Sequence, residues 1–277
     1  MKWCRDARLA VCLVVVAHIS LGAQATLDAP LPHATGQSVT PSYEGWFENP
    51  DGTFSLSFGY FNRNYEEHLD ISVGPDNQFE PGPADRGQPT HFLPRRQTGV
   101  FTIVVPADFG DQQITWRLTA YGETFSIPGR LRPEWQIDAL REVTSGNEPP
   151  TLRFGEDDAP LVGPTGGHAR LSTSVGEPAR VSVWASDDGV RKFRASRRSP
   201  QLGLVWSKYR GPGEVRFSDP APEVDDAGKA TTEATFAEPG DYVLRVLAWD
   251  DSGPQRATMA SGFQCCWTNA YVDVSVR

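Results

Sequence analysis

Two segments decide the fold, VWSKYRGPGEVRFSDP at positions 205–220 and TFAEPGDYVLRVLAWDDS at positions 235–252. In the first, two extended runs flank the turn Gly211-Pro212-Gly213. In the second, a strand starts at a Pro-Gly-Asp-Tyr corner, and apolar side chains recur at every second position from Tyr242 onward. Period two is the pattern of a strand with one buried face. The two segments therefore predict half of an antiparallel β-sandwich.

The rest of the chain extends this pattern. Helical periodicity is almost absent, and the 26 glycines and 23 prolines separate short alternating runs, which is typical of all-β proteins. A chain of this length suits two domains of about 100–130 residues, each with its own core. We therefore predict an all-β fold of two β-sandwich domains in tandem, over 41–138 and 151–277. The second is immunoglobulin-like, and residues 139–150 form a stiff, extended linker.

The first domain starts with a predicted hairpin. Tyr43–Glu48 and Thr53–Asn62 flank the turn Asn49-Pro50-Asp51-Gly52, in which proline and glycine supply the required backbone angles. In the second strand of this hairpin, aromatic and aliphatic side chains alternate with small ones, as in a half-buried strand. Residues 74–99 are rich in Pro, Gly and Asp and read as one long loop.

The second domain also resembles a known family. Trp206-Ser207-Lys208, Gly211-Pro212-Gly213, Ala234-Thr235-Phe236 and Pro239–Val246 are similar to the polycystic-kidney-disease-type (PKD-like) immunoglobulin-fold repeat. This resemblance implies a fold, and a role as a spacer or binding module of bacterial secreted proteins. The N-terminal half resembles only uncharacterised bacterial secreted proteins, through residues 59–64 and 89–96.

Independently of that resemblance, Gly240–Leu244 has the layout of a tyrosine corner, in which the Tyr hydroxyl bonds back to upstream backbone. Leu244 stands where antibody domains place the second cysteine of the inter-sheet disulfide. We therefore expect packing alone to hold the two sheets together.

The N-terminus predicts export. Lys2, Arg5 and Arg8 precede an apolar run, and Ala23-Gln24-Ala25 is a small-x-small cleavage site, so residues 1–25 read as a signal peptide. We expect a disordered segment over 26–40, no transmembrane segment in the mature chain, and a secreted or periplasmic location. Removing the signal takes the formal net charge from −9 to −11. An acidic chain repels nucleic acid, so we expect no such partner.

Two cysteines remain after this cleavage, Cys265 and Cys266. In an oxidising compartment an intramolecular bridge can join only these neighbours, which predicts a vicinal disulfide. The alternatives are two thiols, buried or bridged to another chain, and a redox or metal function.

Two acidic pairs follow predicted strands of the second domain. Asp187-Asp188 and Asp250-Asp251 would emerge at one end of an immunoglobulin-type sandwich, where four carboxylates suit Ca²⁺. The alternative is that these aspartates are ordinary turn residues. We expect no other cofactor.

Other candidates are weaker. Five basic residues within 191–198 read as a solvated loop or as a site for an anionic glycan. The aromatics of the first hairpin and the residues after it, Trp46, Phe47, Tyr60, Phe61 and Tyr65, read as core or as a sugar-stacking surface. The four histidines of the mature chain appear scattered, and no hydrolase, zinc-protease, phosphate-loop or Cys-x-x-Cys motif occurs.

These observations favour a non-enzymatic function. The leading hypothesis is a non-catalytic exported binding or adhesion module for a glycan, a surface or a partner protein. The first alternative is a structural or assembly component of the cell envelope. The second is a redox or hydrolytic enzyme that uses the Cys265-Cys266 loop or a carboxylate pair.

Overall fold

A computed structural model describes residues 33–143, 145–190, 202–250 and 265–277. The expected signal peptide over 1–25 and the first part of the expected disordered segment lie outside these residues. Residues 33–277 form one compact unit. Apart from one short 3-10 helix, the regular elements of the described residues are strands, so the predicted all-β class is confirmed. Within the described chain, no helix has the length and apolarity needed to cross a bilayer.

The first sandwich consists of two three-stranded antiparallel sheets and a short strand pair. One sheet has the order β1-β2-β6, from β1 (Val39–Glu48), β2 (Phe54–Asn62) and β6 (Arg95–Val105). The other has the order β4-β7-β8, from β4 (Asn77–Glu80), β7 (Ile114–Ala120) and β8 (Glu123–Gly129). β3 (Leu69–Asp70) pairs with β5 (His91–Phe92), and the helix η1 (Pro133–Trp135) follows β8.

Aromatic rings fill the core between these two sheets. Phe58 of β2 lies at their centre, with its ring centroid 5.4–5.5 Å from those of Phe79 and Phe101 and 6.2 Å from that of Trp116. Rings that meet at these distances gain about 0.5–1.5 kcal/mol per pair beyond their buried area. The alternation predicted for β2 therefore points its large side chains into the core, as expected.

The first sandwich differs from the expectation at two places. It begins before position 41, because Val39 is fully buried at the start of β1 and the carbonyl of His33 accepts a hydrogen bond from Tyr65 N. The expected loop over 74–99 is not a single loop, because it contains β4, β5 and the first part of β6. The short strands β4 and β5 lack the alternating pattern by which longer strands are found. The expected turn is present, with Gly52 N donating to Asn49 O at 2.9 Å.

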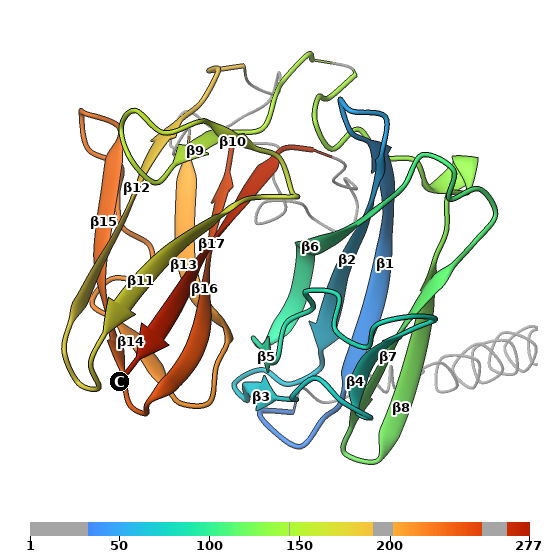
Figure 1. The fold of residues 1–277 in the computed structure, drawn as a ribbon, viewed down its shortest axis with the longest axis horizontal. Coiled ribbons are helices and arrows are strands. Elements are labelled where there is room, and N and C mark those ends of the chain that lie inside the picture. Colours follow the sequence, from blue (N-terminus) through green and yellow to red (C-terminus); the bar gives the residue numbers. More distant parts are fainter. Residues whose placement is uncertain (1–32, 144, 191–201, 251–264) are drawn as a thin grey trace, which may run out of the picture. The chain divides into compact units, whose positions relative to one another are not determined.

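The second sandwich has immunoglobulin topology (Figure 1). One sheet has the order β10-β9-β12-β15-β14, from β9 (Thr151–Arg153), β10 (Leu161–Val162), β12 (Ala179–Ser186), β14 (Val215–Phe217) and β15 (Lys229–Phe236). The other has the order β11-β17-β16-β13, from β11 (His168–Thr173), β13 (Gly203–Arg210), β16 (Gly240–Trp249) and β17 (Trp267–Val276). β11 runs parallel to β17, whereas the other strand pairs of this sandwich are antiparallel. After β12 the chain crosses to the other sheet for β13, returns for β14 and β15, and crosses again for β16 and β17, as in immunoglobulin domains.

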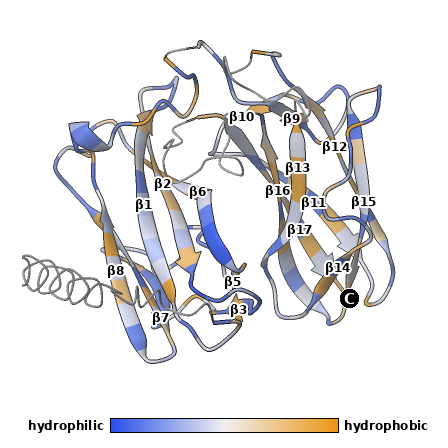
Figure 2. Ribbon diagram, turned by 180° about the vertical axis from the view of Figure 1, so that it is seen from behind, coloured by the Kyte–Doolittle hydropathy of each residue, from blue (hydrophilic) through white to orange (hydrophobic). Residues whose placement is uncertain are grey.

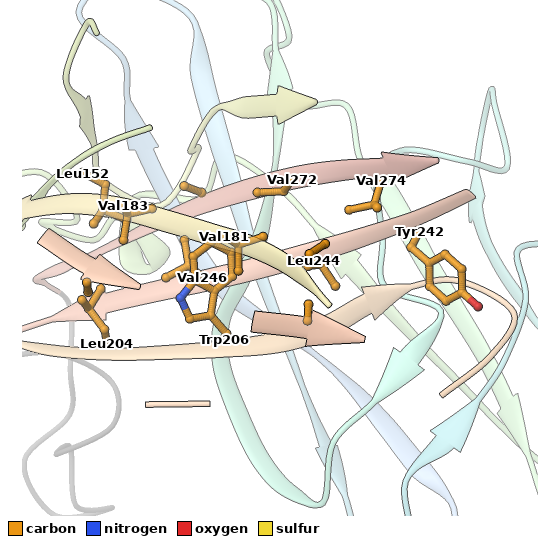
Figure 3. Close-up of a cluster of buried hydrophobic side chains, with 14 of the residues drawn as sticks. Leu152, Val181, Val183, Leu204, Trp206, Tyr242, Leu244, Val246, Val272 and Val274 are labelled. Carbon is orange, nitrogen blue, oxygen red and sulfur yellow. The ribbon is translucent and has the colours of Figure 1, made fainter. Parts of the chain in front are cut away.

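Two features of the second core follow from the sequence (Figure 3). Trp206 of β13 is 2% exposed and packs among valines and leucines from both sheets. The hydroxyl of Tyr242 donates to the carbonyl of Glu238 at 2.8 Å and accepts from Gly213 N at 3.1 Å. This is the geometry of a tyrosine corner, and it links the start of β16 to the Gly-Pro-Gly turn. Leu244, in the position of the missing cysteine, is fully buried.

The segment over 139–150 is packed against the sandwiches. Ala139 is fully buried in a third apolar cluster with Phe47, Leu247 and Trp267, and Asn147 is 1% exposed. Leu247 lies in the β11-β17-β16-β13 sheet. In this sheet the strands β13 and β16 carry hydrophobic stretches, whereas β6 of the first sandwich carries a hydrophilic stretch (Figure 2). Leu244 of β16 is buried in the core of the second sandwich and Leu247 of the same strand in the third cluster, so β16 has buried side chains on both faces of its sheet.

Candidate functional site

The sheets β1-β2-β6 and β11-β17-β16-β13 meet at a joint centred on Gly99 of β6. The Gly99 carbonyl accepts three hydrogen bonds, from Arg245 Nη2 at 3.1 Å, Trp267 Nε1 at 3.0 Å and Asn269 Nδ2 at 3.0 Å. Gly99 has a φ of +58°, and a Cβ there would lie 2.4 Å from the Trp267 ring. Glycine is required at this position by both its backbone conformation and the close approach of the indole.

Arg245 carries a buried positive charge into the joint. It is 4% exposed, and its Nε and Nη2 donate to Asn269 Oδ1 at 2.9 and 2.7 Å. Glu44 lies nearby in β1, where its carboxylate accepts hydrogen bonds from Gly99 N at 2.5 Å and Arg96 Nη2 at 2.9 Å. Burial raises the pKa of Glu44 to about 7, although Arg96, the Gly99 N–H and the charge of Arg245 oppose this shift.

Further contacts extend the joint along the two sandwiches. Tyr271 Oη donates to the carbonyl of Val100 at 3.1 Å, and Tyr209 Oη donates to that of Gly87. Arg210 pairs with Asp85 at 2.8 Å, and this ion pair is partly exposed. The pair is bidentate, since Arg210 Nη1 also donates to Asp85 at 3.0 Å, and Arg210 Nε donates to the carbonyl of Gln88 at 2.7 Å. The joint is therefore held by these contacts as well as by the buried ones around Gly99.

Beside this joint lies a cavity of about 690 Å³ lined by both sandwiches, here called the junction cleft. The first sandwich supplies His68, Asp70, His91, Leu93 and Gln97. Outward-facing residues of β13 and β16 form the opposite wall, together with residues around the Gly-Pro-Gly turn. The residues on this wall include Val205, Ser207, Lys208, Glu214, Phe217, Glu238, Arg245 and Leu247.

A chain of polar contacts runs along the cleft. Lys208 Nζ donates to the carbonyl of Gly213 and to Asp70 Oδ1, both at 3.0 Å. The same Asp70 oxygen lies 2.8 Å from His91 Nδ1, and His91 Nε2 lies 3.0 Å from His68 Nδ1. We refer to Lys208, Asp70, His91 and His68 as the polar relay. β3 and β5 pair side by side, which brings Asp70 opposite His91.

The relay shifts the pKa values of two of its members. Burial alone would raise the pKa of Asp70, but its hydrogen bonds and charge interactions with His91 and Lys208 lower it. The pKa of His68 is lowered, first by burial and then by the charges of His91 and Lys208, while Asp70 acts in the opposite direction. At neutral pH the cleft therefore presents an ionised Asp70 and a neutral His68.

The structure places three of the four predicted calcium ligands. Asp188 Oδ2 accepts from Glu148 N at 3.0 Å, and Asp250 Oδ2 accepts from Asn147 Nδ2 at 2.5 Å. The loops after β12 and β16 thus meet on the 139–150 segment, whereas Asp187 Oδ2 accepts from its own loop at Gly189 N.

Asp251, the fourth predicted ligand, lies outside the described residues. Among the residues that are described, no cluster of three or more His, Cys, Asp or Glu side chains could hold a metal ion. The calcium site stays a prediction. It is checked by measuring whether Ca²⁺ raises the melting temperature of the mature chain.

Cys265 and Cys266 lie directly before β17. Their sulfur atoms are bonded to each other, both side chains are buried, and Cys266 Sγ lies 3.4 Å from the carbonyl oxygen of Asn147. Trp267, the next residue, donates to Gly99, so the cysteines sit beside the joint. Their pairing in the purified protein is checked by alkylation and peptide mass spectrometry. Two alkylated thiols in unreduced protein would contradict the vicinal bridge.

The remaining candidates are the basic loop and the aromatic residues of the first hairpin. The basic loop over 191–198 lies outside the described residues. Of the aromatics in and after the first hairpin, Phe47 and Tyr60 are buried, whereas Tyr65 is 49% exposed and its ring lies 3.9 Å from the guanidinium carbon of Arg95. The core interpretation therefore holds for the buried rings and not for Tyr65.

Sequence reasoning missed the polar relay. His68 and His91 are separated by 23 positions in the sequence and read as scattered residues, but the pairing of β3 with β5 brings their rings together. Lys208 comes from the other sandwich, so no local pattern could place it next to Asp70. No local pattern connected the two histidines, because His68 precedes the supposed loop over 74–99 and His91 lies inside it.

Comparisons with known proteins identify no family. No family model matches the sequence, and no curated protein matches it. Similar solved structures include domains 4 and 5 of the S-layer protein SbsC, with 14% identity, and the D0-D1 domain of intimin, with 11% identity. In both cases the alignment covers 86% of this chain and 97% of the other chain, with a TM-score of 0.25. A protein of unknown function from Porphyromonas gingivalis W83 matches with 9% identity, covers 86% of this chain and 99% of that chain, and also has a TM-score of 0.25.

TM-scores of 0.25 are too low to support an argument about the fold, so the fold assignment rests on the strand order. Membership of the PKD-like repeats, which the sequence resembles, stays a prediction.

Proposed function

We propose that this chain is a non-catalytic exported module that binds carbohydrate in the junction cleft. The observation that carries the proposal is the cleft itself, a cavity of about 690 Å³ with walls from two sandwiches. Ligand sites of about 300–1,000 Å³ are common where two domains meet. Export follows from the expected signal peptide over 1–25.

The lining of the cleft supports a carbohydrate ligand. Side chains that accept hydrogen bonds, such as Asp70 and Glu238, stand among donors such as Lys208 and Gln97. Phe217 and Leu247 supply apolar surface between them. A sugar ring presents hydroxyl groups at its edge and C–H groups on its face, so it needs this mixture of polar and apolar contacts.

The test is a binding assay on an array of immobilised oligosaccharides, probed with the mature chain. Ser207→Trp places an indole on the wall of the cleft and is expected to abolish the binding seen with the parent chain. Ser182→Trp makes the same exchange on β12, where Ser182 bonds to Thr231 away from the cleft, and should leave binding unchanged. Failure of the parent chain to bind any oligosaccharide, or equal binding by both variants, would overturn the proposal.

The buried joint favours one second candidate, a spacer in a cell-envelope assembly. Three side chains, one of them the buried Arg245, donate to the carbonyl of Gly99 and tie the two sandwiches together. A spacer that transmits a fixed geometry would require such a joint. A correctly folded chain that binds no oligosaccharide on the array would favour this candidate. An enzymatic role through Cys265-Cys266 would instead require a measured activity that Cys265→Ser removes.

A further inference from the structure

We infer that the ring of Tyr65 stacks against a sugar unit of the ligand just outside the junction cleft, and that the ligand is therefore an extended oligosaccharide rather than a single sugar. This inference rests on the proposed function and adds to it the length of the ligand and the residue that binds its outer part.

Three side chains where β2 ends and β6 begins, here called the aromatic rim, carry the first step. The guanidinium carbon of Arg95 lies 3.9 Å from the centroid of the Tyr65 ring and 5.1 Å from that of the Phe61 ring. The guanidinium covers one face of Tyr65, yet this residue is 49% exposed, so the opposite face of the ring is open to a ligand. The C–H face of a sugar ring packs well on such an exposed aromatic surface.

The aromatic rim lies next to the cleft. Tyr65 precedes His68, which lines the cleft, by three positions, so their Cα atoms are at most about 11 Å apart. Arg95 stands between Leu93 and Gln97, which also line the cleft, and its Cα lies at most about 7 Å from each of theirs. A ligand that runs out of the cleft past these residues therefore reaches the aromatic rim.

The rim also faces the side on which the second sandwich packs. Tyr60 of β2 points into the core of the first sandwich, so its neighbours Gly59 and Phe61 point to the opposite face. A Cβ on Gly59 would collide with the Glu44 carboxylate, which belongs to the joint. The Phe61 ring, with the Arg95 guanidinium over it, thus lies on the face that carries the joint.

The backbone at the rim is held in an unfavourable conformation. Of the non-glycine residues that the structure describes, only Arg95 and Tyr121 have a positive φ, +65° and +52°. This left-handed conformation is unfavourable for a residue with a Cβ, and it occurs at ligand sites where the surrounding contacts maintain it. Tyr121 is 55% exposed, and its hydroxyl donates to Glu67, the residue directly before His68. Both residues therefore contact the segment from Tyr65 to His68, which leads from the rim to the cleft.

Stacking outside the cleft makes a specific demand on the length of the ligand. A short oligosaccharide that fits within the cleft leaves Tyr65 exposed, whereas a longer one covers the open face of its ring and removes apolar surface from water. The affinity should therefore rise with chain length until one sugar unit lies on Tyr65, and then level off.

The experiment measures the affinity of the mature chain for oligosaccharides of increasing length, built from the sugar unit with the strongest array signal. For the parent chain, the affinity is expected to rise about 3–10-fold between the short and the long members of the series. Tyr65→Ala should remove this rise and bind the shortest member as the parent chain does. Tyr65→Phe should keep the rise, because the ring and not the hydroxyl makes the contact.

The matched control is Trp135→Ala. Trp135 is exposed to a similar extent, 47%, but it lies beside Gly45, whereas Phe61 of the rim pairs with Thr40 toward the other end of β1. This variant should show the same rise as the parent chain. Each variant is compared with the parent chain by melting temperature, so that a loss of folding is not read as a loss of binding.

Two kinds of result would overturn the inference alone. An affinity of the parent chain that does not depend on ligand length, or an equal rise in Tyr65→Ala, would remove Tyr65 from the site and leave binding in the cleft, where Ser207→Trp still abolishes it. Loss of the rise in Trp135→Ala would show that the effect is not specific to the rim. Absence of binding to the whole array would overturn the proposed function and this inference with it, which keeps the two failures distinguishable.

Discussion

The two sheets of the second sandwich have similar strands but different surroundings. In β12 buried residues alternate strictly with less buried ones, because one face lies on the core and the other on solvent. In β16, Leu244, Val246, Leu247 and Ala248 are all buried, and in β17 the first six residues are buried without interruption. The first sandwich covers the outer face of these two strands, so both of their faces exclude water.

This difference shows what alternation can and cannot reveal. A period of two identifies a buried face only where the other face is wet. Arg245 and Asn269 lie on the outer face of β16 and β17, where their polarity suggests solvent, yet they are buried and hydrogen-bonded at the joint. Four measurements can break or sharpen the comparison between the two sheets.

The largest effect is expected for two leucines on opposite faces of β16. Leu244 points into the sandwich core and Leu247 into the cluster at the joint, and they are 0% and 2% exposed. Leu244→Ala and Leu247→Ala should each lower the free energy of unfolding by about 2–5 kcal/mol, measured by denaturant titration.

The matched control is Val162→Ala at an exposed position of the other sheet, where the loss should stay within about 0.5 kcal/mol. A cost for Leu247→Ala close to that of this control would show that the outer face of β16 is not buried in solution.

Gly99→Ala should destabilise the joint by about 2–5 kcal/mol. The left-handed backbone costs about 1–2 kcal/mol for a residue with a Cβ, and the contact with Trp267 adds an overpacking cost of about 1–3 kcal/mol. Denaturant unfolding and limited proteolysis measure this loss, and we expect cleavage between the sandwiches to become faster.

Gly122→Ala provides the control for backbone conformation. Gly122 also has a positive φ, +77°, but nothing lies within 4 Å of its added Cβ. It should lose only the conformational part, about 1–2 kcal/mol. Equal losses in the two variants would mean that Trp267 does not press on Gly99.

The pH dependence of stability should report Glu44. Its pKa is about 7 in the folded protein, above the ordinary value of 4.5, so the folded state binds this proton more tightly than the unfolded chain does. The stability that protonated Glu44 contributes is therefore present below about pH 4.5 and is lost as the pH rises to about 7.

Glu44→Gln should flatten this part of the pH profile by about 1–3 kcal/mol, measured by denaturant unfolding between about pH 5 and pH 8. Arg96→Ala serves as the comparison, because it removes a partner of Glu44 and leaves the titrating carboxyl in place. A parent profile that is flat in this range would refute the assignment.

The smallest effect is expected on the solvent-facing sheet of the second sandwich. Arg216 of β14 pairs with Glu214 at 2.8 Å, and both side chains are more than half exposed. Arg216→Ala should change the free energy of unfolding by less than about 1 kcal/mol, as for most exposed ion pairs. A larger loss would indicate that this sheet is also covered in solution.

The candidate site was less predictable than the strands. The tyrosine corner, the turn from Asn49 to Gly52 and the inward large side chains of β2 follow from local patterns, because turn chemistry and alternation act over a few residues. The polar relay depends on the pairing of two-residue strands and on a lysine from the second sandwich. Such short strands carry too few residues for a period to be visible.

The sequence by itself determined the all-β class, the aromatic face of β2 and the immunoglobulin layout around Tyr242, since each depends on side-chain alternation or turn residues. Only the tertiary structure decided which sheet would be covered on both faces, that Gly99 would receive three donors, and that His68 would meet His91 beside Lys208. The physical reason is that contacts between distant segments depend on how two finished surfaces fit together. That fit is a property of shape and hydrogen-bond geometry in space, which the order of residues along the chain does not display.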